Sequence, residues 1–276
     1  MKIISIPPKN DLLKNYIDCI HILQKEHHEK DVDIIVFPHV NTGISFSKTA
    51  KLIKVNANYF KLKHDPNNTV LVYFNHNLNT PKRLSYEGFY YEITISFKPL
   101  GIYAFLNNEV PVGNSVDCFT PFIPFPDFEE TAIKMLSLND KTTLVEQLES
   151  YMLSKLNTFE HAFLKEAVEE IQDPTFTVKE FTKKNNLTVK SFIFHFKKYL
   201  GRTPTQHKKI LRFRHSIDKK YAMNRNKNFT QVALDAGYFD QSHFIKDYKN
   251  LIGEIPKEFF KNINDFLDTG VVHAQG

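Results

Sequence analysis

A short segment near the C-terminus places hydrogen-bonding and basic side chains on one face of a predicted helix. Phe244 and Tyr248 lie four residues apart, so in a helix that begins after Asp240 they share one face. The opposite face then carries Gln241, Ser242, Ile245, Lys246 and Lys249, and His243 lies beside the cap of the helix. Gln and Ser side chains hydrogen-bond to base edges or phosphates, and Lys reaches guanine or a phosphate. We therefore expect this face to contact the major groove of double-stranded DNA. His243 either donates to a phosphate or packs against a neighbouring helix.

A second segment repeats this arrangement with less typical side chains. Its inward stripe consists of Phe192, His195, Phe196 and Tyr199, and its expected DNA contacts are Lys190, Ser191, Ile193, Phe194 and Lys197. Ile193 and Phe194 cannot form bidentate hydrogen bonds, but apolar groups can contact thymine methyls. Alternatively, this pair docks the segment on the N-terminal half of the chain. We favour DNA contact because the flanking residues Lys190 and Lys197 are basic.

Both segments belong to an internal repeat that predicts the elements around them. The pairs Phe192 and Phe244, Phe196 and Tyr248, Gly201 and Gly253, and Pro204 and Pro256 are each 52 residues apart. Each copy has a short helix, a turn and a second helix, which is the order of a helix-turn-helix. In the second copy, Ala233 is the small residue of the first helix that packs between the two helices. Gly237 supplies the turn, and Asp240 caps the second helix. In the first copy, Asn186 replaces the turn glycine, which is tolerated because Asn adopts left-handed backbone angles readily.

The repeat resembles the C-terminal DNA-binding domain of the AraC/XylS family of bacterial transcription regulators. The residues that carry the resemblance are Ala233-x-x-x-Gly237-Tyr238-x-Asp240-x-Ser242-x-Phe244-x-Lys246-x-Tyr248-Lys249, the Gly-x-x-Pro that follows, and the weaker upstream copy. The resemblance covers about Phe176 to Asn262. It implies a sequence-specific regulator, expected to be an activator, whose two recognition helices enter successive major-groove segments. It also implies RNA polymerase, a small-molecule effector and a second copy of the chain as candidate partners. Lys246 stands where family members usually carry Arg.

Residues 205–223 predict the helix that joins the two copies. Ile210, Phe213, Ile217 and Tyr221 recur at helical spacing. About 18 helical residues span roughly 27 Å. Successive turns of the same groove are ~34 Å apart, so this helix plus the widths of its neighbours can place both copies one turn apart. The basic residues between Lys208 and Lys220 are expected to be partly phosphate contacts and partly solvated. Arg212 is either a phosphate contact or a structural bridge.

The charge of the chain is divided unevenly. Residues 177–261 hold 19 Lys and Arg residues against 7 Asp and Glu residues, a net charge of +12. Residues 1–176 hold 17 basic and 22 acidic residues, a net charge of −5. Such an asymmetry is expected when one domain binds phosphates and the other does not.

The N-terminal part predicts strands followed by helices. Phe89, Tyr91, Ile93, Ile95 and Phe97 alternate with polar residues, the period of a strand with one apolar face. Several such runs predict a β-sandwich or barrel. Residues 96–106, and more loosely 35–46, resemble cupin-like regulatory domains of the same family. Helices are expected within 127–171, and their apolar stripes either cover the strands, which we favour, or form a dimer interface. The expected fold class is α+β, with residues 1–173 as a β-rich regulatory domain, 174–264 as the all-α DNA-binding domain and 265–276 as a tail.

The sequence argues against several other classes of protein. The histidines lack the spacing of a catalytic cupin metal site, and no Gly-rich phosphate loop is present, so we expect neither an enzyme nor a metal or other cofactor. Cys19 and Cys118 are expected to be small buried hydrophobes in a reducing compartment. No apolar run approaches membrane-spanning length, so we expect a cytoplasmic protein without membrane partners. The alternative function is an architectural or partner-binding protein that holds DNA without reading it and without a ligand response.

Overall fold

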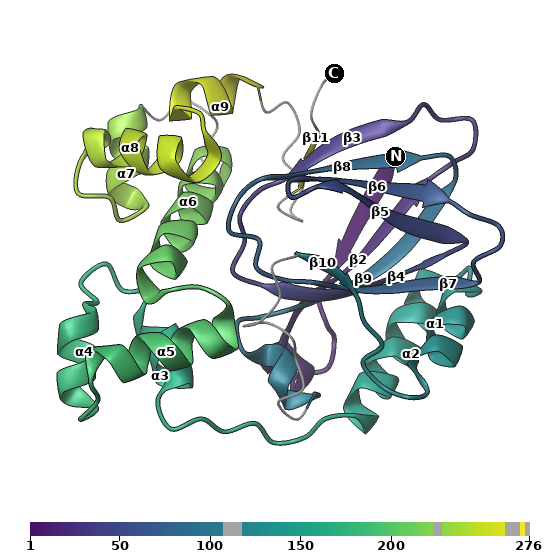
Figure 1. The fold of residues 1–276 in the computed structure, drawn as a ribbon, viewed down its shortest axis with the longest axis horizontal. Coiled ribbons are helices and arrows are strands. Elements are labelled where there is room, and N and C mark those ends of the chain that lie inside the picture. Colours follow the sequence, from purple (N-terminus) through teal and green to yellow (C-terminus); the bar gives the residue numbers. More distant parts are fainter. Residues whose placement is uncertain (107–117, 223–227, 263–270, 274–276) are drawn as a thin grey trace.

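The computed structural model describes residues 1–106, 118–222, 228–262 and 271–273. Its strands are β1 (Lys2–Ile6), β2 (Ile17–Lys25), β3 (Val32–Val36), β4 (Thr42–Lys48), β5 (Ala50–Asn56), β6 (Tyr59–His64), β7 (Val70–Asn75), β8 (Lys82–Glu87), β9 (Tyr90–Phe97), β10 (Phe119–Pro121) and β11 (Val271–His273). Its helices are η1 (Leu13–Asn15), η2 (Gly101–Ala104), α1 (Phe128–Leu136), α2 (Lys141–Ser154), α3 (Leu164–Glu170), α4 (Val178–Lys184), α5 (Val189–Leu200), α6 (Pro204–Ala222), α7 (Phe229–Asp235), α8 (Gln241–Ile252) and α9 (Pro256–Asn262). Figure 1 shows the strands gathered on one side and α3–α9 on the other.

The strands form a sandwich of two sheets. The first sheet has the order β1-β2-β9-β4-β7-β10, and the second has the order β11-β3-β8-β6-β5. Pairing is antiparallel except between β6 and β8, which run parallel. In the described residues no strand of one sheet pairs with a strand of the other, so the β part is a sandwich and not a closed barrel. With the helices that follow, the predicted α+β class is confirmed. Part of the predicted tail joins the second sheet, because β11 pairs with β3.

Helices α1 and α2 cover the outer face of the first sheet. Ile93, Ile95 and Phe97 of β9 point into this layer and are fully buried. Phe46 of β4 meets Phe128 of α1 edge to face, with ring centroids 5.4 Å apart. The predicted stripe of α2 lies in the same core, where Leu144, Leu148 and Met152 are buried. The stripe therefore covers the sheet, as favoured from the sequence.

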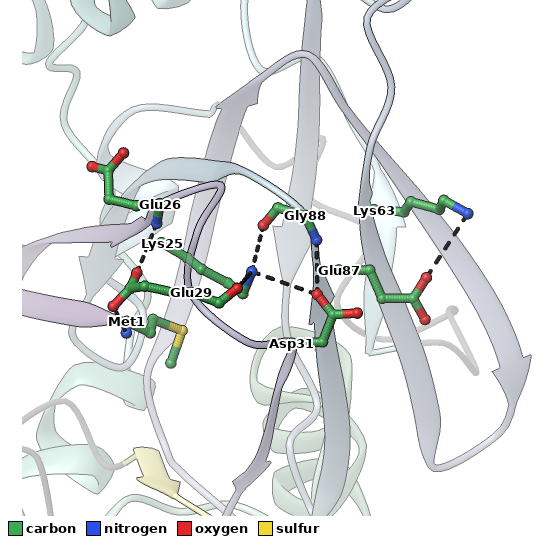
Figure 2. Close-up of polar contacts among 8 residues, drawn as sticks. All are labelled: Met1, Lys25, Glu26, Glu29, Asp31, Lys63, Glu87 and Gly88. Carbon is green, nitrogen blue, oxygen red and sulfur yellow. Dashed lines mark hydrogen bonds and ion pairs between the residues drawn. The ribbon is translucent and has the colours of Figure 1, made fainter.

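A buried lysine fixes one end of the sandwich (Figure 2). The ammonium of Lys25 is fully buried and donates to the carbonyls of Glu29 at 3.0 Å and Gly88 at 2.7 Å. Its Nζ lies 3.5 Å from Oδ1 of Asp31, which also accepts a hydrogen bond from the Gly88 N–H. Glu29 in turn binds the amino group of Met1 at 2.6 Å. Several charged hydrogen bonds thus join the N-terminus, the β2–β3 turn and the β8–β9 turn.

The helix α3 packs with the first helix-turn-helix and not with the sandwich core. Leu164, Ala167 and Ile171 share one buried cluster with Phe181 of α4 and Phe192 of α5. This packing groups α3 with the helices that follow it, one helix before the predicted boundary after residue 173. The position of the boundary stays a prediction, which truncation tests (Discussion).

Among the described residues, no helix is long and apolar enough to cross a lipid bilayer.

Candidate nucleic-acid interface

Two helix-turn-helix units lie at the ends of α6 (Figure 1). We call α4 and α5 the first unit, and α7 and α8 the second unit. Both α5 and α8 have 12 residues. Thr188 caps α5 by accepting from the Ser191 N–H, and Asp240, 52 positions later, caps α8 by accepting from the His243 N–H. Both helices end at a glycine in the left-handed region, Gly201 with φ 66° and Gly253 with φ 84°. The repeat in the sequence therefore places equivalent caps at both ends of α5 and α8.

The turns between the helices also match. Asn186 has φ 53° and Gly237 has φ 82°, so both occupy the left-handed region. The Leu187 N–H donates to the Thr182 carbonyl, and the Tyr238 N–H donates to the Ala233 carbonyl, each at 2.9 Å. The second turn is one residue longer, since the turns are 51 apart and the caps 52. The additional residue is Phe239, whose side chain is 86% exposed. Sequence comparison of the two copies would have found this insertion.

The inward residues form the cores of the units. Phe192, Phe196, Ala233, Phe244 and Tyr248 are fully buried. The hydroxyl of Tyr248 also meets Ser216 of α6 at 2.5 Å, which fixes α8 against α6. Pro204 and Pro256 are the first residues of α6 and α9. These prolines suit a first turn because their missing N–H has no helical partner there.

The outward face of α8 is open. The side chains of Gln241, Ser242, Lys246 and Lys249 are exposed, and Ile245 is 37% exposed. Gln241 lies against α7, because its Oε1 accepts from the Thr230 hydroxyl at 3.0 Å. The N-terminal end and the outer side of α8 therefore present amide, hydroxyl and ammonium groups to solvent.

Beside this face, a cluster of charged side chains surrounds Asp247, a residue that was not among the sites predicted from the sequence. Asp247 is buried and lies 2.7 Å from Nη2 of Arg212, 3.2 Å from Nζ of Lys209 and 3.4 Å from Nε2 of His243. Arg212 also lies over the ring of Tyr238. Arg212 is thus a structural bridge between α6 and α8. His243 is half-buried in the same cluster and packs against its neighbours, although its edge stays accessible.

The outward face of α5 combines cations with an exposed aromatic ring. Lys190 and Lys197 are exposed, Ser191 and Ile193 are half-buried, and the side chain of Phe194 is 62% exposed. The ring of Phe194 meets His195, which lies 3.3 Å from His161 through ring nitrogens. The described residues of the N-terminal sandwich therefore do not bury Phe194.

One basic residue of α6 is neither a phosphate contact nor solvated. Arg214 is buried and donates through Nε to the Pro38 carbonyl and through Nη2 to the Phe37 carbonyl, each at 2.7 Å. Burial lowers the pKa of its guanidinium to about 9. The sequence-based expectation of a phosphate or solvent role is therefore wrong for Arg214. Helical periodicity shows which face of α6 is apolar, but it does not reveal that an arginine on that helix enters another domain.

The end of α5 also contacts the N-terminal sandwich, at Gly201. The Tyr103 hydroxyl donates to the Tyr199 carbonyl at 3.0 Å. A Cβ on Gly201 would lie 1.5 Å from Oδ1 of Asn77, whereas a Cβ on Gly253 would meet nothing within 4 Å. Gly201 and Gly253 thus both end a helix at positive φ, but only Gly201 is packed closely against another side chain.

We expect Gly201→Ala to destabilise the full chain more than Gly253→Ala. Both variants place Ala at positive φ, which costs roughly 1–2 kcal/mol. Only Gly201→Ala must also displace Asn77, and overpacking costs roughly 1–3 kcal/mol more. The free energies of unfolding from denaturant titration measure the difference. Equal losses would show that Asn77 moves aside without cost.

A cavity of about 310 Å³ lies between the two sheets. The first sheet contributes polar side chains, including His21, Asn75, Glu92 and Thr94, and the second contributes Ile34, Val36, Leu84 and Tyr86. Glu92 accepts from the hydroxyls of Tyr73 at 2.5 Å and Tyr90 at 2.7 Å, and burial raises its pKa. Burial lowers the pKa of His21 to about 4, so this imidazole is neutral at pH 7. The cavity thus has one hydrogen-bonding wall and one apolar wall.

The order of residues in the sequence does not reveal this cavity. Alternation along β9 predicts one apolar face, and in a half-buried strand the polar residues between Ile93 and Phe97 would then face solvent. They face the second sheet instead. Within the described residues, no group of three or more His, Cys, Asp or Glu side chains is placed to hold a metal ion.

Comparison with known proteins supports the helical part of this description. Residues 181–262 match a family model described as a helix-turn-helix domain. No curated protein sequence matches the chain. Among solved structures, ToxT from Vibrio cholerae is similar over 88% of this chain and 97% of its own, with 12% identity and a TM-score of 0.46. The ToxT structure with a bound unsaturated fatty acid is similar over 93% of this chain and 96% of its own, with 13% identity and a TM-score of 0.44.

Proposed function

We propose that this chain, a DNA-binding transcription regulator with an AraC-type helix-turn-helix domain at its C-terminus, reads its operator with α5 and α8 in successive segments of the major groove. The observation that supports this proposal is the pair of recognition helices with the same length and the same caps at the two ends of α6. The 19 residues of α6 span roughly 28 Å, which suits neighbouring groove segments on one side of the duplex.

In this proposal the two recognition helices have different tasks. The exposed Gln241, Ser242 and Lys246 of α8 supply hydrogen bonds that distinguish base pairs. Lys190 and Lys197 of α5 neutralise phosphates and hold the ring of Phe194 against the groove. His243 and Lys249 contact the backbone at the edges of the α8 site, and Ser191 does so beside α5. Activation of transcription is an expectation from the family resemblance.

Replacing Gln241 and Lys246 by Ala tests the α8 site. We expect each variant to weaken operator binding by ~1–3 kcal/mol, because each removes a base or phosphate contact. Lys165→Ala on α3 is the matched control, since it removes one exposed positive charge from a surface outside both recognition helices. Affinities for operator and for random DNA, measured at one salt concentration, are the readout. Operator affinity unchanged in both variants would contradict the α8 site, and equal affinity of the parent for both DNAs would favour the architectural alternative.

Replacing Phe194 by Ser tests the α5 site. An exposed aromatic ring on a recognition face contacts thymine methyls. We expect Phe194→Ser to weaken operator binding, and we expect uracil in place of the facing thymines to reproduce much of the loss in the parent protein. The variant and the uracil operator together should lose little more than either alone. Independent, additive losses would show that Phe194 and the methyl groups do not touch.

The cavity between the sheets is the proposed site of a small-molecule effector. Its polar wall can satisfy hydroxyl, carbonyl or amino groups, while Ile34, Val36 and Leu84 cover an apolar side of the same molecule. Arg214 of α6 also lines this cavity. An effector there would therefore touch both the sandwich and the DNA-binding part.

A further inference from the structure

The segment Val36–His39, which begins at the last residue of β3 and leads towards β4, is held by hydrogen bonds from two arginines of the helical part. Arg214 of α6 donates to the carbonyls of Phe37 and Pro38. Arg202, which follows α5, donates through Nη1 to the carbonyl of His39 at 2.7 Å. Both arginines are buried, with exposed fractions of 9% and 2%. A buried guanidinium with poor partners is costly, so these hydrogen bonds hold the segment in one position.

Phe37 is at the same time a core residue of the second unit. Its side chain is 8% exposed and packs with Phe213 of α6 and Phe259 of α9, at centroid distances of 6.1 and 5.0 Å. Phe213 and Phe259 in turn contact Tyr248 of α8, at 5.0 and 5.4 Å. A side chain from the N-terminal sandwich therefore completes the hydrophobic core that supports the recognition helix α8.

The same segment forms part of the cavity wall. Val36 and His39 line the cavity, as does Arg214. Neighbouring residues of the segment thus point to different places, since Val36 and His39 line the cavity and Phe37 enters the second unit. Any displacement of the cavity wall at Val36 or His39 must move Phe37 or stretch the hydrogen bonds to Arg214, because one short stretch of backbone carries all of them.

We propose that Val36–His39 is the element that couples the cavity to DNA binding, by setting how firmly α8 is held. When Phe37 is seated, the second unit has a complete core and α8 is fixed. When the segment shifts, the core of the second unit opens on one side and α8 loosens, while the first unit keeps its own separate core. The effect on DNA rests on the proposed function, but the effect on the stability of the second unit does not.

The test compares Phe37→Ala with Phe46→Ala in the full chain by hydrogen exchange. Phe46 is a matched control because it is equally a buried Phe of the sandwich, but it packs against α1 and not against the second unit. We expect Phe37→Ala to speed exchange in α7 and α8 by about a hundredfold, since a Phe→Ala change leaves a large cavity. Exchange in α4 and α5 should stay at the parent rate. Phe46→Ala should leave α7 and α8 at the parent rate. Unchanged exchange of α8 in Phe37→Ala, or equal acceleration in both units, would overturn the proposal.

A second variant tests the hydrogen bonds from Arg214 to the segment without changing an apolar side chain in the core of the second unit. Arg214→Lys keeps the positive charge but replaces the planar guanidinium, whose Nε and Nη2 donate to two adjacent carbonyls in a fixed geometry, by a single ammonium without that geometry. We expect it to speed exchange in Val36–Asn41 and in α8 at least tenfold. Parent-like exchange would show that charge alone suffices and would contradict the geometric coupling.

Operator titration then separates this inference from the proposed function. With the parent protein, base changes in the half-site of α8 should reduce operator affinity. With Phe37→Ala, the factor by which the same base changes reduce affinity should be at least ten times smaller. If exchange responds as expected but no operator is bound by the parent, the proposed function fails and the structural coupling stands. If the parent binds its operator and the cost of the base changes is the same in both proteins, the coupling fails.

Discussion

A fragment of residues 157–264 should fold, whereas a fragment of residues 174–264 should lose its first helix-turn-helix unit. The shorter fragment lacks α3 and with it Phe163, Leu164 and Ile171, which are buried against Phe181 and Phe192. Removing one large buried side chain costs roughly 2–5 kcal/mol. Removing three therefore costs roughly 6 kcal/mol or more, which is comparable with the whole stability of a small domain.

Circular dichroism and hydrogen exchange of the two fragments measure this loss. Both fragments lack Phe37, so any difference between them belongs to α3. The shorter fragment should show α4 and α5 exchanging freely while α8 exchanges as in the longer fragment. Protected α4 and α5 in both fragments would place the boundary after residue 173, as the sequence predicted.

Operator affinity of the full chain should fall about a thousandfold when the salt concentration rises from 50 to 200 mM. About six phosphate contacts give a slope of about −5 in log affinity against log salt, and a fourfold change in salt then produces this loss. The net charge of +12 in residues 177–261 would suggest more contacts. However, Arg202, Arg212 and Arg214 are committed to internal partners, and Lys184 and Lys208 also bind groups within the protein.

Titrations at several salt concentrations with one operator measure the slope. Lys246→Ala should make the slope shallower by about one, because it removes one counterion-releasing contact. Arg214→Lys should leave the slope unchanged, since that side chain is buried away from solvent. A flat dependence in the parent would mean that phosphates contribute little and that the exposed lysines of α5 and α8 do not meet DNA.

Local rules predicted the helical part well because each unit is specified within about 25 residues. Caps at Thr188 and Asp240 and left-handed ends at Gly201 and Gly253 are all encoded next to the helices that they bound. The polar face of β9 was harder to interpret. Alternation shows that Glu92 and Thr94 lie opposite Ile93 and Ile95, but it cannot tell solvent from a polar cavity covered by a second sheet.

Contacts between distant segments could not be predicted from such rules. Arg214 and Phe37 are 177 residues apart, and nothing near either residue signals the other. The same holds for α3, whose apolar stripe is equally suited to the sandwich and to the first unit. For Phe37 and for the stripe of α3 the sequence indicates that apolar side chains are buried without showing where, and for Arg214 it does not indicate burial at all.

The pairing of β11 with β3 means that the helical part is tied to the sandwich at both of its ends. Before α3, the Asn157 N–H donates to the carbonyl of Ala104 in η2. At the other end, β11 pairs with β3, the strand that leads into Val36–His39. A segment held at both ends stays at high effective concentration near its docking site even when its contacts break. Undocking and redocking of the helical part should therefore be rapid, unimolecular and independent of protein concentration.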